Sequence, residues 1–130
     1  MAVPTQIDVV AAGGSTGWPQ EIAWNSALRH VPAAATAAVV TIEADASRPN
    51  VISQIFWSYS AAPTAGSLKV EDVSGTIVWG PHHITAGGPG QVDFMPPLCN
   101  AVKNTAMIVT LASGGGAVEG VLSVNAYKRK

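Results

Sequence analysis

The chain contains few charged residues and a single cysteine. Asp, Glu, Lys and Arg make up 12% of the 130 residues, against about 25% in a typical soluble domain, and the formal net charge is −1. Proteins that bind nucleic acid or anionic lipid need many cations to neutralise phosphates, so we expect neither partner. Cys99 has no second cysteine with which to form an intrachain disulfide or a cysteine zinc site. An uncharged surface of this kind favours contacts with another protein.

The sequence also lacks a long apolar run. Its most Ala-rich stretch, residues 31–40, is much shorter than the roughly 20 apolar residues that cross a bilayer. Residues 1–14 lack the basic start and compact apolar centre of a signal peptide. We therefore expect a protein that is made in the cytoplasm, is not exported by a signal peptide and does not insert into a membrane.

Patterns of the common catalytic and metal sites are missing as well. His82 and His83 are adjacent, and neighbours on a strand point to opposite faces, so the two cannot chelate one ion together. Four carboxylates could supply oxygen ligands, but their spacing matches no calcium loop. They are Glu43, Asp45, Glu71 and Asp72. No G-x-S-x-G motif frames a serine, and Cys99 is expected to be a buried apolar thiol. We expect no catalytic residue, no metal and no cofactor.

What the chain does contain is a series of short β-patterned segments separated by Gly and Pro. From residue 36 onward, apolar residues recur mainly with period two. The longest predicted strand, residues 51–60, places Ile55 on one face and Ile52 and Phe56 on the other. The other predicted strands are residues 36–44, 67–73, 76–79, 82–85, 91–95, 105–112 and 117–127.

About eight short strands without a helical pattern between them predict an all-β fold, an antiparallel β-sandwich or jelly roll. A closed barrel is the second choice. Ser74 and Gly75 are predicted to turn a hairpin, and the Gly-rich residues 87–90 are predicted to form a turn. Glycines and prolines interrupt the earlier part, so residues 1–35 are predicted to be an extended N-terminal arm and residues 36–130 the sandwich domain.

Two groups of residues near the ends of the chain are candidates for contacts. Trp18 and Trp24 lie in the predicted arm, where exposed indoles would be unfavourable, so we expect them to pack on the sandwich or on a neighbouring subunit. Lys128, Arg129 and Lys130 hold three of the seven basic residues of the chain. This basic tail either meets an acidic surface of a partner or remains solvated.

Three aromatic residues lie on neighbouring predicted strands. Trp57, Tyr59 and Trp79 could form a flat platform for a sugar ring, or they could fill the core or an interface between subunits. We expect the core or interface role.

Four segments of the chain together resemble small β-sandwich proteins encoded among the head genes of tailed bacteriophages. They read I-x-W-S-Y-S-A-A-P-T-x-G-S-L-x-V-E-D over residues 55–72, H-I-T-A-G-G-P-G over 83–90, P-P-L over 96–98, and N-T-A-M-I-V-T-L-A-S-G-G over 104–115. The usual role of these proteins is to decorate, or cement, the head. The resemblance covers roughly residues 50–125 and says little about the N-terminal arm.

The resemblance implies a structural virion protein without enzymatic activity. It would form homo-oligomers, dimers or trimers, on the outer capsid surface and bridge neighbouring subunits of the major capsid protein. Three alternatives remain open. The sandwich could be a carbohydrate-binding module with exposed aromatics, a component of the tail or baseplate, or a small hydrolase with converging histidine and carboxylate groups.

Overall fold

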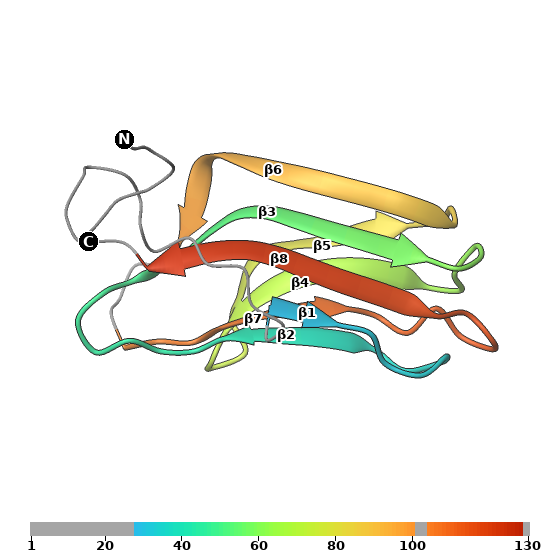
Figure 1. The fold of residues 1–130 in the computed structure, drawn as a ribbon, viewed down its shortest axis with the longest axis horizontal. Coiled ribbons are helices and arrows are strands. Elements are labelled where there is room, and N and C mark those ends of the chain that lie inside the picture. The colour runs from blue at the N-terminus through green and yellow to red at the C-terminus, as the bar shows by residue number, and fades with distance from the viewer. Residues whose placement is uncertain (1–27, 101–103, 129–130) are drawn as a thin grey trace, which may run out of the picture.

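The protein is a β-sandwich made of two four-stranded antiparallel sheets (Figure 1). The computed structural model describes residues 28–100 and 104–128, and no α-helix occurs among them. The strands are β1 (Arg29–His30), β2 (Ala38–Ile42), β3 (Asn50–Tyr59), β4 (Gly66–Asp72), β5 (Ile77–Ile84), β6 (Gly88–Cys99), β7 (Met107–Leu111) and β8 (Gly120–Lys128). One sheet has the order β1-β8-β3-β6 and the other β2-β7-β4-β5. The predicted β-sandwich is confirmed, whereas the jelly-roll variant stays a prediction.

Consecutive strands mostly alternate between the two sheets. The hairpin of β4 and β5 is the exception within the described strands, and it confirms the turn predicted at Ser74 and Gly75. Gly75 has a φ of +89°, which glycine adopts without strain, and its N–H donates to the Asp72 carbonyl at 3.1 Å. The Asp72 carboxylate accepts hydrogen bonds from the Ser74 hydroxyl and from the Ser74 and Thr76 N–H groups, which lowers the pKa of this carboxyl.

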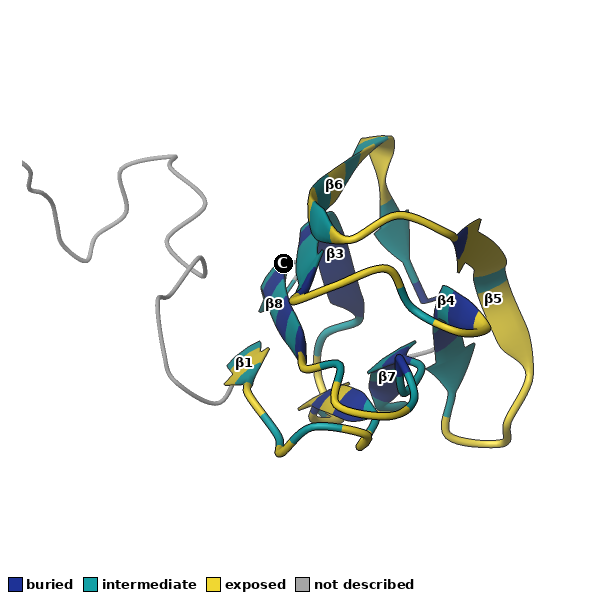
Figure 2. Ribbon diagram, turned by 90° about the vertical axis from the view of Figure 1, so that its right-hand side faces the viewer, coloured by how far each residue is buried: buried dark blue, intermediate teal, exposed yellow. Residues whose placement is uncertain are grey.

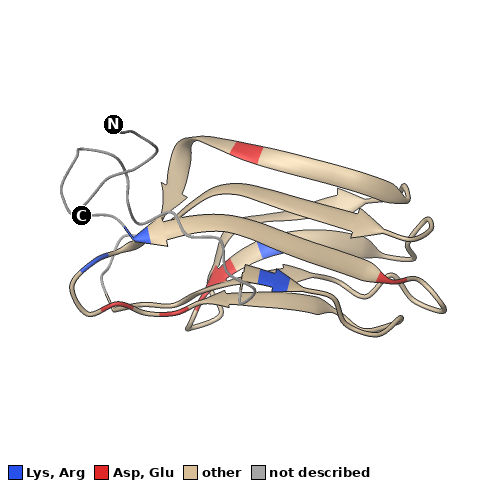
Figure 3. Cartoon of the chain, viewed as in Figure 1, with Lys and Arg blue, Asp and Glu red and all other residues tan. Residues whose placement is uncertain are grey.

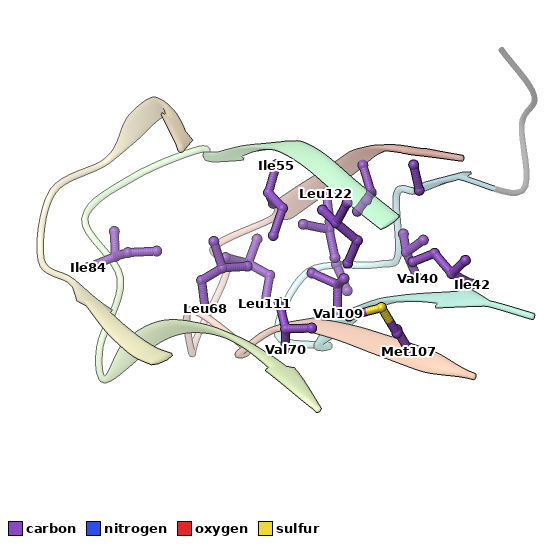
Figure 4. Close-up of a cluster of buried hydrophobic side chains, with 14 of the residues drawn as sticks. Val40, Ile42, Ile55, Leu68, Val70, Ile84, Met107, Val109, Leu111 and Leu122 are labelled. Atoms are coloured by element: carbon purple, nitrogen blue, oxygen red, sulfur yellow. The ribbon is translucent and has the colours of Figure 1, made fainter. Parts of the chain in front are cut away.

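The core lies between the sheets and consists mainly of aliphatic side chains that alternate along the strands. Figure 4 shows Ile55 and Leu122 of one sheet facing Leu68, Val109 and Leu111 of the other. All five are fully buried. This alternation is the reason that the segments form strands, because period two places every second side chain on the apolar face.

A β-bulge in β3 corrects one predicted face. The pairing of β3 with both neighbours shifts between Ile52 and Gln54, so an extra residue enters the strand there. Ile52 and Ile55 are consequently both buried in the core. The prediction that Ile52 points away from Ile55 was wrong because it assumed uninterrupted alternation.

The strands β5 and β6 are longer than predicted. The predicted strands 76–79 and 82–85 form the single strand β5, which runs through Gly80 and Pro81. Strand β6 begins inside the predicted turn 87–90 and continues through three prolines. Both are edge strands, where a residue without an N–H group costs no ladder hydrogen bond on the open side.

The range predicted for the N-terminal arm includes a short strand. Arg29 and His30 form β1, which pairs with Ser123 and Leu122 of β8. The His30 Nδ1 accepts a hydrogen bond of 2.9 Å from the Val39 N–H and so joins β1 to the edge of the other sheet. Residues 1–27 of the arm lie outside the described residues. Within the described part of the chain, no helix is long and apolar enough to cross a membrane.

Candidate interaction surface

The structure describes one of the five predicted contact residues. Trp18, Trp24, Arg129 and Lys130 lie outside the described residues, so their predicted contacts are not tested. Lys128 is the last residue of β8. The contacts of Lys128 therefore show how the first residue of the basic tail interacts with the rest of the chain.

The ammonium group of Lys128 is bound within the sandwich. It donates to the backbone carbonyl of Glu43 and to Oδ1 of Asn50. Partial burial is the main cause that lowers the pKa of Lys128, and the nearby Asp45 carboxylate opposes this shift. This lysine thus has a role in the fold whether or not it also meets a partner.

The side chain of Asn50 forms a buried polar node at this end of the sandwich. Asn50 is only 1% exposed, and its Nδ2 donates to the carbonyls of Ile42 at 3.3 Å, Glu43 at 3.1 Å and Thr105 at 3.0 Å. Asn100 is also buried, and its Oδ1 accepts from the Asn50 N–H at 2.7 Å. The buried Asn50 amide thus connects the end of β2 with the carbonyls of Glu43 and Thr105, which also accept hydrogen bonds from Lys128 and Asn100, respectively.

Four rings gather on the side of the sandwich where β5 and β6 form the sheet edges. The Trp79 ring stacks on His82 at 6.1 Å and meets the edge of Phe94 at 5.3 Å. The Trp57 ring lies 5.6 Å from His82. Trp57, Trp79 and Phe94 are half-buried against the core, so they fill the opening between the sheets.

Tyr59 lies apart from this ring cluster and is 1% exposed. Its hydroxyl donates to the Ala112 carbonyl at 2.6 Å, and burial raises the pKa of this hydroxyl. Because Tyr59 is buried and the two tryptophans are half-buried, these three residues do not make an exposed row. The expected core role of Tyr59 is confirmed.

The candidate catalytic and metal-binding residues do not converge. His82 packs among the tryptophans, and the neighbouring His83 is exposed on the same edge strand. Cys99 is half-buried, and its thiol donates to the Asn100 carbonyl at 3.4 Å. Across residues 28–100 and 104–128, no three His, Cys, Asp or Glu side chains lie close enough to hold a metal ion.

Apolar side chains are exposed along the same side of the molecule as the ring cluster. Figure 2 shows that β5 is exposed over most of its length. The exposed large apolar residues of the β4–β5 hairpin and of β6 are Val73, Ile77, Val78 and Met95. Unpaired edge strands with exposed apolar side chains are surfaces on which another protein can bind.

The C-terminal part of β6 makes a pronounced arch away from β3. Asp93 pairs with Gln54 and Leu98 pairs with Ile52, so residues 94–97 lie opposite a single residue of β3. We call residues 94–97 the β6 arch, and Figure 1 shows β6 bending sharply near its C-terminal end. The bond between Met95 and Pro96 in the arch is a cis peptide bond.

A mainly apolar groove of about 670 Å³ lies at the β6 arch. We call it the arch groove, and its lining residues are Ser53 and Gln54 of β3 and Asp93, Phe94, Met95, Pro96 and Pro97 of β6. Its volume lies within the range of about 300–1,000 Å³ that is usual for ligand-binding pockets. The groove therefore offers space for apolar groups of a binding partner.

A chain of hydrogen bonds fixes the acidic side chain beside the groove. Asp93 Oδ1 accepts from Nε2 of Gln54 and from Nε2 of Gln91, both at 2.8 Å. The Oε1 of Gln54 accepts in turn from Nδ2 of Asn125 at 2.7 Å. Asp93 is the only charged residue of β6 and forms no ion pair with a described residue (Figure 3). A carboxylate without an ion pair to the described residues thus lies at the rim of an apolar groove.

Sequence reasoning missed the arch groove. The signal in the sequence is the pair Pro96 and Pro97 directly after an exposed methionine, a pattern that interrupts strand pairing. The number of residues in the arch, however, depends on where β3 and β6 pair again, and that register is a tertiary property.

Comparisons of the chain with protein-family models, with curated proteins and with solved structures found no match. The resemblance to phage head proteins therefore stays a prediction from the motifs in the sequence.

Proposed function

We propose that this protein is a structural virion protein that decorates the outer surface of a bacteriophage capsid. It would cement the shell by bridging neighbouring subunits of the major capsid protein, as a dimer or trimer at a symmetry axis. The proposal combines the motif resemblance over residues 50–125 with the surface described above. It includes no enzymatic activity, no cofactor, no nucleic acid and no membrane.

The observation that supports a docking role best is the concentration of binding features on one side of the sandwich. Both sheet edges formed by β5 and β6, the arch groove and four of the six exposed large apolar residues in the described part of the chain belong to this side. Exposed apolar side chains at unpaired edges are unfavourable in isolation and become favourable when a partner covers them. A rigid body with several such contacts can hold two capsid subunits at once, and linked contacts strengthen each other.

The test uses heads assembled without this protein. Purified full-length chain is added to them, unbound protein is removed by sedimentation, and the particles are imaged. We expect saturable binding with additional density at symmetry-related positions on the outer shell. Binding to isolated tails instead of heads would assign the protein to the tail or baseplate. Binding to neither would overturn the proposed function.

A further inference from the structure

The β6 arch is open toward solvent on its most apolar side. Met95 is 89% exposed, and Pro96 and Pro97 beside it are also exposed. Val73, the next most exposed large apolar residue among those described, is 66% exposed and lies in the turn between β4 and β5. Methionine is flexible and polarisable, so Met95 can adapt to the shape of an incoming apolar group.

Asp93 gives the groove a specific electrostatic preference. Both amides that hold its Oδ1 are neutral, so they orient the carboxylate without cancelling its charge. The chain Asn125–Gln54–Asp93 crosses three neighbouring strands and restricts the rotation of the carboxylate. A preorganised carboxylate that pairs with none of the described cations is complementary to Arg or Lys, and Arg can bind it through two parallel hydrogen bonds.

The backbone of β6 limits the shape of the occupant. No described strand pairs with the outer side of β6, so its main-chain groups can receive a further strand. Pro89 on one side and Pro96 and Pro97 on the other lack N–H groups. A short extended segment fits this edge, because residues 90–95 are the longest run of β6 in which every residue has an N–H group.

Residues 1–27 at the beginning of the chain do not supply the required charge. Residues 1–27 contain no Lys or Arg. The described basic residue nearest the C-terminus, Lys128, donates to Glu43 and Asn50 instead. Neither residues 1–27 nor a described cation of the chain supplies the charge, so we consider a segment of a separate protein as the occupant.

We propose that the arch groove binds an extended segment of the major capsid protein in which an apolar side chain is followed closely by Arg or Lys. The apolar side chain would enter the groove beside Met95, and the cation would pair with Asp93. This inference rests on the proposed function and adds the binding site and the chemistry of the partner segment.

The first test measures binding of full-length variants to undecorated heads. Met95→Ser removes the apolar wall, and Asp93→Arg reverses the charge. Val39→Ser is the matched control for an exposed apolar residue, because Val39 lies on β2, at the opposite edge of its sheet from β5. Glu119→Arg is the control for charge reversal, because this exposed residue precedes β8 at the opposite end of the sheet.

We expect Met95→Ser and Asp93→Arg to weaken head binding by at least about tenfold, as changes at the centre of an interface do. Both control variants should stay within about twofold of the wild type, as is usual for residues outside an interface. Unchanged binding by Met95→Ser and Asp93→Arg would overturn the inference that the arch groove is the binding site, while the proposed function would stand. If either variant instead abolished self-association of the free protein, the groove would belong to a second copy of the chain and the inference would be wrong.

The second test does not depend on heads. The full-length chain, labelled with ¹³C at its methionine methyl groups, is titrated with the peptide acetyl-Ser-Leu-Val-Arg-Ser-amide and with the same peptide carrying Glu in place of Arg. The Met95 signal is the one lost in Met95→Ser. We expect a saturable shift of this signal by the Arg peptide and at least about tenfold weaker binding of the Glu peptide. Equal effects of the two peptides, or no shift of the Met95 signal, would overturn the inference. If the wild type fails to bind heads, the proposed function is wrong. The titration then tests by itself whether the arch groove binds a segment with an apolar side chain and a cation.

Discussion

At the scale of single residues, the buried amide of Asn50 determines how one end of the sandwich is held together. One side chain serves three loop carbonyls and the Lys128 ammonium. A buried carbonyl without a hydrogen bond costs more free energy than the bond itself gains in net terms. The folded state is therefore more sensitive to this asparagine than to a polar residue on the surface.

Replacing Asn50 by alanine is expected to lower the free energy of unfolding by about 2–3 kcal/mol, because its side-chain hydrogen bonds to three carbonyls and to Lys128 are lost together. The measurement is the midpoint of urea unfolding at neutral pH. Asn125→Ala is the control, because Asn125 donates a single side-chain bond to Gln54 on the outer face of the sheet. Asn125→Ala should lower the free energy of unfolding by about 0.5–1 kcal/mol. Equal losses in the two variants would contradict the role of the Asn50 node.

Tyr59 gives the protein a dependence on alkaline pH. Burial raises the pKa of its hydroxyl, so the unfolded chain ionises first as the pH rises above about 10. The stabilisation from Tyr59 is thus complete below that pH and is lost as the pH rises toward the higher pKa of the folded state. Between pH 8 and 11.5, we expect the unfolding midpoint of the wild type to fall more steeply than that of Tyr59→Phe.

The Tyr59→Phe variant should also be less stable by about 1 kcal/mol at pH 8, since it lacks the hydrogen bond to the Ala112 carbonyl. Tyr127→Phe removes a half-buried hydroxyl near the end of β8 and controls for the general loss of stability in alkali. Parallel pH curves for the wild type and Tyr59→Phe would show that the ionisation of Tyr59 is not involved.

At the scale of elements, the edge strands β5 and β6 explain most of the differences between prediction and structure. Both contain glycine and proline, which in a sequence indicate a turn. An edge strand tolerates these residues because one side of its backbone has no partner. The inner strands β7 and β8 contain no proline and show regular alternation of buried residues, so their positions followed from the sequence.

The pairing of β6 with β3 requires a glycine opposite Trp57. A Cβ atom at Gly90 would lie 2.3 Å from two carbons of the Trp57 ring. We expect Gly90→Ala to lower stability by about 1–3 kcal/mol, because the ring must move within a packed cluster. Near-ultraviolet circular dichroism and tryptophan fluorescence should change together with the unfolding midpoint.

The control for this substitution is Gly75→Ala in the β4–β5 turn. Gly75 also resists a side chain, through its φ of +89°, but nothing lies within 4 Å of the added Cβ. Gly75→Ala should lower the free energy of unfolding by about 1 kcal/mol through backbone strain, without a change in the tryptophan signals. If Gly90→Ala leaves the tryptophan spectra unchanged, the close packing of Trp57 on this glycine is not the reason for the loss.

At the scale of the whole molecule, the two sides of the sandwich differ. On one side, β5 and β6 leave both sheet edges open next to the ring cluster. On the other side, His30 of β1 binds the backbone of β2 and connects the two edges. A single-sided binding surface suits a protein that lies on a larger assembly, because the opposite side can remain in contact with solvent.

A contribution of the N-terminal arm to capsid binding can be tested with a truncation that leaves the described strands intact. Leu28 packs against the core, and Arg29 and His30 pair with β8, so the deletion should remove residues 1–26 and no more. We expect the shortened protein to keep the unfolding midpoint of the full chain but to bind heads at least about tenfold more weakly, since linked contacts strengthen each other. Binding equal to that of the full chain would contradict a contribution from the arm.

The sequence was sufficient to predict the class of fold and the approximate positions of most strands, because alternation of apolar residues is a local signal. It was not sufficient for the face of Ile52, which depends on a bulge shared by three strands. It was also not sufficient for the arch groove, because Gln54, Asp93 and Asn125 come together only through the pairing of distant strands. The motifs led to a functional hypothesis, whereas the position of a binding surface required the register of the sheets.

The order of strands also has a consequence for folding. Strand β8, the most C-terminal of the described strands, lies inside its sheet between β1 and β3, and β7 lies inside the other sheet between β2 and β4. Neither sheet can form its inner ladders until the C-terminal third of the chain has left the ribosome. Pairings between residues so distant in sequence are slow to form, on the order of milliseconds to seconds in all-β domains. During synthesis, the apolar faces of β3 and β4 must therefore wait for β7 and β8, which are made after the other described strands, and the sandwich folds as one unit after translation of β8.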